Sequence, residues 1–147
     1  MVNDVVVVGV DDSPGARAAL AWAARYAAST GARLRIVHAY EFNLAWIDAA
    51  SPDLPLWEQR ARITAEDALA RIVTGTFGGR APDGTELRTV QGPPSAVLYE
   101  EGRTASLPVV GTRGRGGFAS LLLGSVSQRL TQHAPCPVVV PPPHERA

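Results

Sequence analysis

Fifteen residues near the middle of the second half of the chain, GTRGRGGFASLLLGS at positions 111–125, combine five glycines, two arginines and three hydroxyl side chains. Glycines allow a chain to turn, and they also allow its backbone to approach a ligand that a side chain would block. Bare amides followed by the start of a helix, here at Gly124 and Ser125, form an anion site from backbone dipoles. The segment therefore predicts either a turn or a phosphate-binding loop.

The chain lacks several residues that other chemistries need. All fourteen basic residues are arginines, so a P-loop lysine, a Schiff base and the lysine of a receiver domain are excluded. The single cysteine, Cys136, and three scattered histidines give no metal-ligand spacing. No catalytic set is recognisable, although Asp11, Arg113 and Arg115 could be recruited. These absences favour binding over rapid turnover and predict no catalytic and no protein-bound metal residues.

Apolar runs and helical patterns alternate along the chain. The run DVVVVGV is typical of a strand covered on both faces, and the helix after it begins with Asp, Ser and Pro14. Strands are expected at residues 4–10, 31–40, 85–90, 107–111 and 136–141, and helices at 11–30, 57–74, 93–104 and 124–134. The pattern predicts one α/β domain over residues 1–147, with a mainly parallel sheet and helices on both faces.

One long segment departs from this pattern. Residues 41–56 hold aromatic residues and two prolines with no sustained period, which predicts a long loop, and we expect Phe42, Trp46 and Trp57 to sense nucleotide if this loop is a lid. Pro108 must be the first residue of its strand or forfeit a ladder bond, because proline has no N–H. His38 and His133 end elements, where an imidazole satisfies carbonyl groups, so structural roles are expected for both.

In an open parallel sheet, ligands bind beyond the carboxyl ends of the strands, where the strand order reverses. Three segments stand at such ends: VDDS after the first strand, HAY after the second and GTRGRGG after the fourth. The third segment is the richest in glycine. The expected binding site therefore lies where these segments meet.

Four sequence blocks carry a family resemblance. They are VVVVGVDDSPGARAALAWAA, GARLRIVHAY, VQGPPSAVL and SQRLTQHAPCPVVVP, and they accompany the spacing Gly111, two residues, Gly114, nine residues, Gly124 and Ser125. Together they resemble the universal stress protein family, in its ATP-binding branch, over nearly the whole chain except residues 41–56. The resemblance implies a Rossmann-like fold with an open five-stranded parallel sheet in the order 3-2-1-4-5, and ATP between the first and fourth strands. Asp12 departs from the family pattern, in which glycine is common at that place.

The resemblance also implies a set of nucleotide contacts. Val10 and Asp11 would flank the adenine and ribose, and the backbone of Ala39 would read the adenine edge. Magnesium would accompany the phosphates without a dedicated protein cage. The remaining expected contacts lie beside the ribose and phosphates: Ser13, Val110, Gly111, Gly114, Arg115, Gly124, Ser125, Val126 and Ser127.

The predicted function is that of an ATP-binding regulator that senses or sequesters ATP during stress. Two alternatives stay open: a slow ATPase or phosphotransferase, and a partner-binding module in which ATP is incidental. The hydrophobic, lysine-free strand at residues 137–141 predicts a homodimer paired through this edge. Zero formal charge and the lack of an apolar run of about 18 residues predict neither nucleic-acid nor membrane binding, and a cytoplasmic location.

Overall fold

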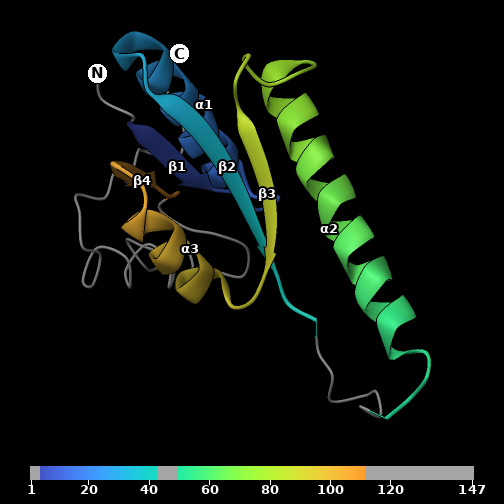
Figure 1. Cartoon of the computed structure of the whole chain (residues 1–147). Coiled ribbons are helices and arrows are strands. Elements are labelled where there is room, and N and C mark those ends of the chain that lie inside the picture. Colours follow the sequence, from blue (N-terminus) through green and yellow to red (C-terminus); the bar gives the residue numbers. More distant parts are fainter. Residues whose placement is uncertain (1–3, 43–49, 112–147) are drawn as a thin grey trace, which may run out of the picture.

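A computed structural model describes residues 4–42 and 50–111, in which four strands alternate with three helices (Figure 1). The elements are β1 (Val5–Gly9), α1 (Pro14–Thr30), β2 (Arg33–Tyr40), α2 (Leu54–Phe77), β3 (Glu86–Gln91), α3 (Pro94–Arg103) and β4 (Leu107–Val109). All strand pairs are parallel, in the order β3-β2-β1-β4. The α/β fold and the order of the first four strands are confirmed. The expected fourth helix and fifth strand lie outside the described residues.

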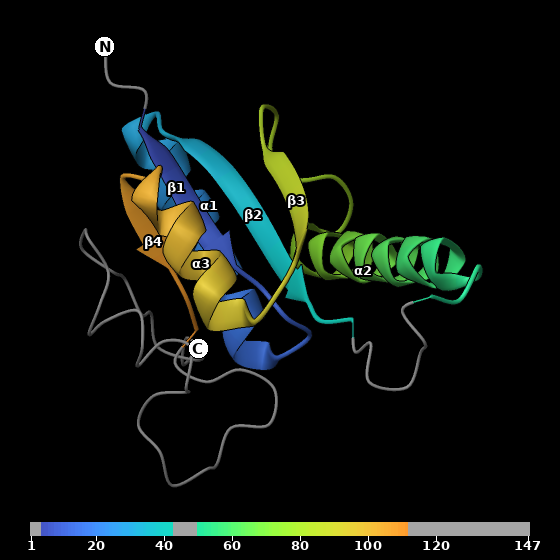
Figure 2. The same cartoon turned by 60° about the horizontal axis from the view of Figure 1, so that its bottom comes forward.

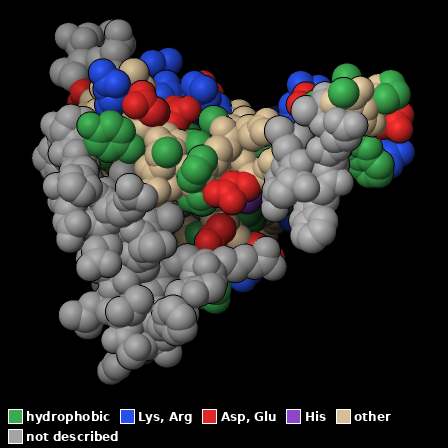
Figure 3. Space-filling model, turned by 90° about the horizontal axis from the view of Figure 1, so that it is seen from below, with side chains coloured by type: hydrophobic (Ala, Val, Ile, Leu, Met, Phe, Trp, Pro, Cys, Tyr) green, Lys and Arg blue, Asp and Glu red, His purple; other side chains and the backbone are tan. Residues whose placement is uncertain are grey.

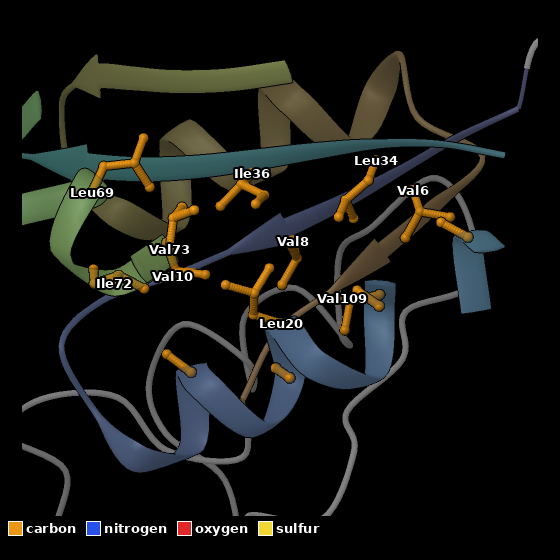
Figure 4. Packing of buried hydrophobic residues seen from close by; sticks show 14 residues of the cluster. Val6, Val8, Val10, Leu20, Leu34, Ile36, Leu69, Ile72, Val73 and Val109 are labelled. Carbon is orange, nitrogen blue, oxygen red and sulfur yellow. The ribbon is translucent and has the colours of Figure 1, made fainter. Parts of the chain in front are cut away.

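The valine run of β1 is central because both faces of this strand are covered. Val6, Val7 and Val8 are at most 1% exposed, as expected for an inner parallel strand. Side chains alternate between the two faces. Figure 4 shows the cluster on one face, where strand residues meet α1 and α2: Val6, Val8, Val10, Leu20, Leu34, Ile36, Leu69, Ile72, Val73 and Val109.

A second cluster covers the opposite face of the sheet. It joins Val5, Val7 and Val37 to Val97 and Leu98 of α3. Helices therefore pack on both faces, as the alternation of elements predicts.

The start and end of α1 follow from local chemistry. The Ser13 side-chain oxygen accepts a hydrogen bond from Ala16 N at 3.1 Å, and Pro14 stands in the first turn, where the helix needs no N–H donor. Gly31 ends the helix with a left-handed φ of 75°. Alanines on the inner side let the helix approach the sheet closely.

Helix α2 is longer than the sequence pattern predicts. It begins at Leu54 rather than Trp57, so the expected loop over residues 41–56 is too long at its end, and it stops at Phe77 rather than Thr74. Pro55 is tolerated because it lies in the first turn. Its 24 residues span about 36 Å, whereas the six residues of β3 span about 20 Å. Residues 43–49, including Trp46, lie outside the described residues.

The first three turns of α2 consequently extend past the sheet, and Figure 2 shows this half of the helix pointing away from it. None of residues 54–64 is buried, and the core contacts begin at Ala65. Leu56, Trp57 and Ile63 are all more than 40% exposed. The Arg60 guanidinium lies over the Trp57 ring, 5.5 Å from its centroid.

Pro108 is the middle residue of β4. The expectation that Pro108 would be the first residue of its strand is therefore wrong. Ser106 N donates to Val5 O at 2.9 Å, and the next donor toward β1 in a parallel ladder would be residue 108, which pairs with Val7. Proline cannot donate there. The second alternative, a forfeited ladder bond, therefore describes the strand.

One nearly buried carboxylate ties α3 to two strands. Glu101 is 8% exposed, and its two oxygens lie 3.3 Å from Arg35 Nη1 and 3.1 Å from Arg88 Nη2. Arg35 also donates through Nε to Glu86 Oε2 at 2.9 Å. The Arg35 side chain is 13% exposed, so water screens this part of the cluster only weakly.

We expect Glu101→Ala to lower the free energy of unfolding by about 2 kcal/mol, because it leaves a nearly buried guanidinium without one of its partners. Glu100→Ala is the matched control. It removes an exposed pair with Arg103 one position earlier on the same helix, and should change stability by less than about 0.5 kcal/mol. Urea unfolding of the two variants measures the difference. Equal losses would mean that the cluster contributes no more than a surface ion pair.

Candidate nucleotide site

The strand order reverses at β1, which makes the carboxyl edge of the sheet a candidate site. The chain passes through α1 to β2 on one side of β1, and later returns through α3 to β4 on the other side. The helices α1 and α3 cover opposite faces, and in open parallel sheets ligands bind beyond the strand ends where two such connections part. Figure 3 looks onto this edge and shows acidic side chains and a histidine gathered near its middle.

The turn after β1 holds itself in place through its own polar groups. Asp11 Oδ1 accepts a hydrogen bond from Ser13 N at 3.0 Å, and Ser13 caps α1. Val10 and Ser13 are buried, at 6% and 7% exposure, while Asp12 is exposed. The turn therefore presents the first amides of α1 toward this edge, with Ser13 in a capping role.

The end of β4 presses against the start of α1. A Cβ atom added at Gly111 would lie 2.9 Å from both C and O of Gly15, and 3.2 Å from Ala16 N. Val110, just before it, is 4% exposed and packs on the α3 side of the sheet. The sequence predicted that glycines here either turn the chain or approach a ligand. For Gly111 the structure shows a close approach to the backbone of α1.

The main chain of β2 alternates in direction at this edge. Arg33 N donates to Asp4 O and Val37 O accepts from Val10 N, both at 2.9 Å, so odd-numbered residues of β2 direct their N–H and C=O toward β1. Tyr40 O accepts from Gly92 N beside β3, at 2.8 Å, which fits the even-numbered set. The N–H and C=O of Ala39 therefore point to the space where β1 has ended.

Half of the sequence-predicted contacts are thus brought to one edge: Val10, Asp11, Ser13, Ala39, Val110 and Gly111. The other half lies outside the described residues: Gly114, Arg115, Gly124, Ser125, Val126 and Ser127.

Sequence reasoning missed one residue at this edge, Gly15, and gave another, His38, only a structural role. Gly15 receives the close approach of Gly111, and its only signal in the sequence is its place after Pro14. His38 approaches the Val10 carbonyl with its Nδ1, at 2.9 Å, and this agrees with the expected carbonyl-satisfying role. Within residues 4–42 and 50–111, no group of three or more His, Cys, Asp or Glu side chains could hold a metal ion. The helices of this same part include none long and apolar enough to cross a membrane.

Comparison with known proteins gives the same fold. A solved universal stress protein UspA from Lactobacillus plantarum superposes with a TM-score of 0.71 at 23% identity, covering 94% of this chain and 97% of its own. A universal stress protein solved in complex with cAMP has a TM-score of 0.63 at 28% identity, covering 93% and 95%. A family member from Arabidopsis thaliana with AMP bound has a TM-score of 0.61 at 21% identity, covering 95% and 91%.

Sequence comparison places the chain in a family. A universal stress protein of Mycolicibacterium smegmatis is 38% identical over 138 residues, which are 92% of this chain and 44% of that protein. This chain spans less than half the length of that relative. A universal stress protein of Thermus aquaticus is 34% identical over 92% of this chain and 96% of its own length. The model of the universal stress protein family matches residues 3–142. The chain belongs to the universal stress protein family.

Proposed function

We propose that this protein binds ATP at the carboxyl edge between β1 and β4 and acts as a regulator that senses or sequesters the nucleotide during stress. The observation that carries the proposal is the meeting of three backbone segments, residues 10–13, 39 and 110–111, at the reversal of strand order. A relative that is 28% identical was solved with cAMP, and this supports an adenine nucleotide as the ligand.

Adenine would lie beside Val10, and the ribose beside Val110, two buried apolar residues at the ends of neighbouring strands. The N–H of Ala39 would donate to adenine N1, and its C=O would accept from the N6 amine. Asp11, whose Oδ1 already accepts from Ser13 N, would provide a carboxylate acceptor for a ribose hydroxyl. Small apolar sites with a few backbone partners are typical of nucleotide bases.

The phosphates would lie near the start of α1, where the helix dipole is positive and Gly111 brings the fourth strand close. Further phosphate contacts are proposed from Gly114, Arg115, Gly124, Ser125, Val126 and Ser127. Mg²⁺ would neutralise phosphate charge when bound with ATP, chiefly through phosphate and water oxygens.

Pairing of residues 137–141 from two copies into a homodimer is also part of this proposal. Light scattering that shows a monomer at micromolar protein concentration would contradict the homodimer.

We expect nucleotide-free protein to gain about 2.7 kcal/mol of stability when Mg-ATP is added at about 100 times its dissociation constant. For a chain of 147 residues this raises the melting temperature by several degrees. AMP and cAMP, tested at the same concentration, should stabilise less because they offer fewer phosphate oxygens. Thermal unfolding measures all three ligands.

Two controls make the result specific. Asp11→Ala should weaken the ATP response, whereas Asp12→Ala, at the exposed neighbouring position, should leave it intact. Chromatography of the bound nucleotide after standing tells binding from slow hydrolysis, because a hydrolase would accumulate ADP. If none of the three nucleotides stabilises the protein, the adenine-nucleotide proposal is wrong and a partner-binding role takes its place.

A further inference from the structure

His38 bonds to the backbone at the end of β1. Its Nδ1 lies 2.9 Å from Val10 O. A carbonyl oxygen can only accept a hydrogen bond, so Nδ1 carries the proton and donates. Val10 N also donates to Val37 O at 2.9 Å. Both polar backbone groups of Val10 are therefore held by β2, one by its main chain and one by a side chain.

This side chain stands where the ladder would otherwise continue. In a parallel ladder that runs Arg33 N to Asp4 O and Val10 N to Val37 O, the next rung joins Ala39 N to Val10 O. Among the described residues, the backbone rungs between β1 and β2 end with that of Val10. The imidazole of His38 bonds to this same carbonyl, and the rung from Ala39 N to Val10 O is not formed.

We propose that His38 is a positioning residue that stops the β1–β2 ladder after Val10 and so keeps the Ala39 N–H available for the base of the nucleotide. The inference rests on the proposed function, because Ala39 is the backbone group assigned to the adenine edge. The inference also gives a physical reason why the site would prefer adenine to guanine. An N–H at Ala39 matches the N1 acceptor of adenine, whereas guanine carries a proton at N1 and would meet donor with donor.

The test compares three replacements of His38. Asn places an amide donor near the position of Nδ1, Gln places its donor farther out, near Nε2, and Leu has no donor. Amide hydrogen exchange at Ala39 is followed in nucleotide-free protein, and binding of Mg-ATP and Mg-GTP is measured by calorimetry. Hydrogen exchange at Ala39 shows whether the hydrogen bond from Ala39 N to Val10 O forms. The ratio of ATP to GTP affinity shows whether the protein distinguishes adenine from guanine.

In the Leu and Gln variants we expect Ala39 exchange to slow about tenfold, because the freed Val10 carbonyl takes this N–H. Their ATP affinity should fall about tenfold while GTP binding changes little, so the selectivity ratio shrinks. The Asn variant should keep both wild-type values. A loss of packing alone would instead lower the melting temperature of all three variants and leave the exchange at Ala39 fast.

The proposal is overturned if Ala39 exchanges as fast in the Leu and Gln variants as in wild type, or if Asn behaves like Leu. Should the Leu variant fail to fold, the Gln variant carries the same comparison, since its polar side chain suits the partly exposed position. If wild-type protein binds neither nucleotide, the proposed function is wrong, and exchange at Ala39 still decides whether His38 stops the ladder.

Discussion

Gly111→Val is expected to abolish nucleotide binding and to lower the free energy of unfolding by about 2 kcal/mol. The new Cβ would lie 2.9 Å from the backbone C and O of Gly15, and backbone atoms cannot turn aside as the end of a long side chain can. The end of β4 must then move away from α1 and open the edge where the phosphates would lie. Calorimetry with Mg-ATP and urea unfolding measure the two effects.

Gly75→Ala is the matched control for this substitution. Gly75 lies inside α2, and a Cβ there would meet nothing within 4 Å. Alanine should raise the free energy of unfolding by about 0.5–1 kcal/mol, because it restricts the unfolded chain and favours the helix, and it should leave ATP binding unchanged. If Gly111→Val binds ATP as well as Gly75→Ala does, the contact between β4 and α1 does not shape the site.

Gly9→Ala is expected to lower the free energy of unfolding by about 2 kcal/mol, because the added methyl group overpacks the face of the sheet that α3 covers. The added Cβ would overlap Cδ1 of Leu98 and would lie 2.7 Å from its Cδ2. Leu98 is 7% exposed and packed in the cluster beneath α3, so its side chain has little room to turn away. Urea unfolding of the variant gives the loss directly.

A double-mutant cycle identifies the cause. Leu98→Ala alone should cost about 3 kcal/mol through the cavity that it leaves. In the Gly9→Ala, Leu98→Ala protein the new methyl group enters that cavity, so the combined loss should fall short of the sum by about 1 kcal/mol or more. Strict additivity would show that Gly9 is needed for some reason other than the proximity of α3.

Much of the fold could be predicted because local rules and packing agree. The valine run of β1 has one explanation, burial on both faces, and the start of α1 carries the serine and proline that helices prefer there. The extension of α2 to Leu54 escaped prediction because none of the residues in its first turns is buried. A helical pattern of apolar residues arises where a helix packs against a core. Residues 54–64 do not pack against the core, so their sequence carries no such pattern.

The candidate site could be predicted in kind but not in its contacts. A glycine at position 111 indicates that the backbone comes close to another group. That this group is Gly15 depends on how β4 packs beside α1, which the sequence does not reveal. The position of His38 at a strand end indicates a bond to a carbonyl. That this carbonyl belongs to Val10 depends on the register of two strands that are distant in sequence.

Helix α2 is one element by its hydrogen bonds but has two regions of different local stability. From Ala65 onward it opens only when the core opens, because Leu69, Ile72 and Val73 are buried against the sheet. None of the residues in the turns before Ala65 is buried, so we expect these turns to unwind from the N-terminal end at a much lower free energy than the rest of the helix, while the domain stays folded. Protease cleavage at Arg60 or Arg62 therefore samples a fraying equilibrium, and its rate reports the helix propensity of these turns rather than the stability of the protein.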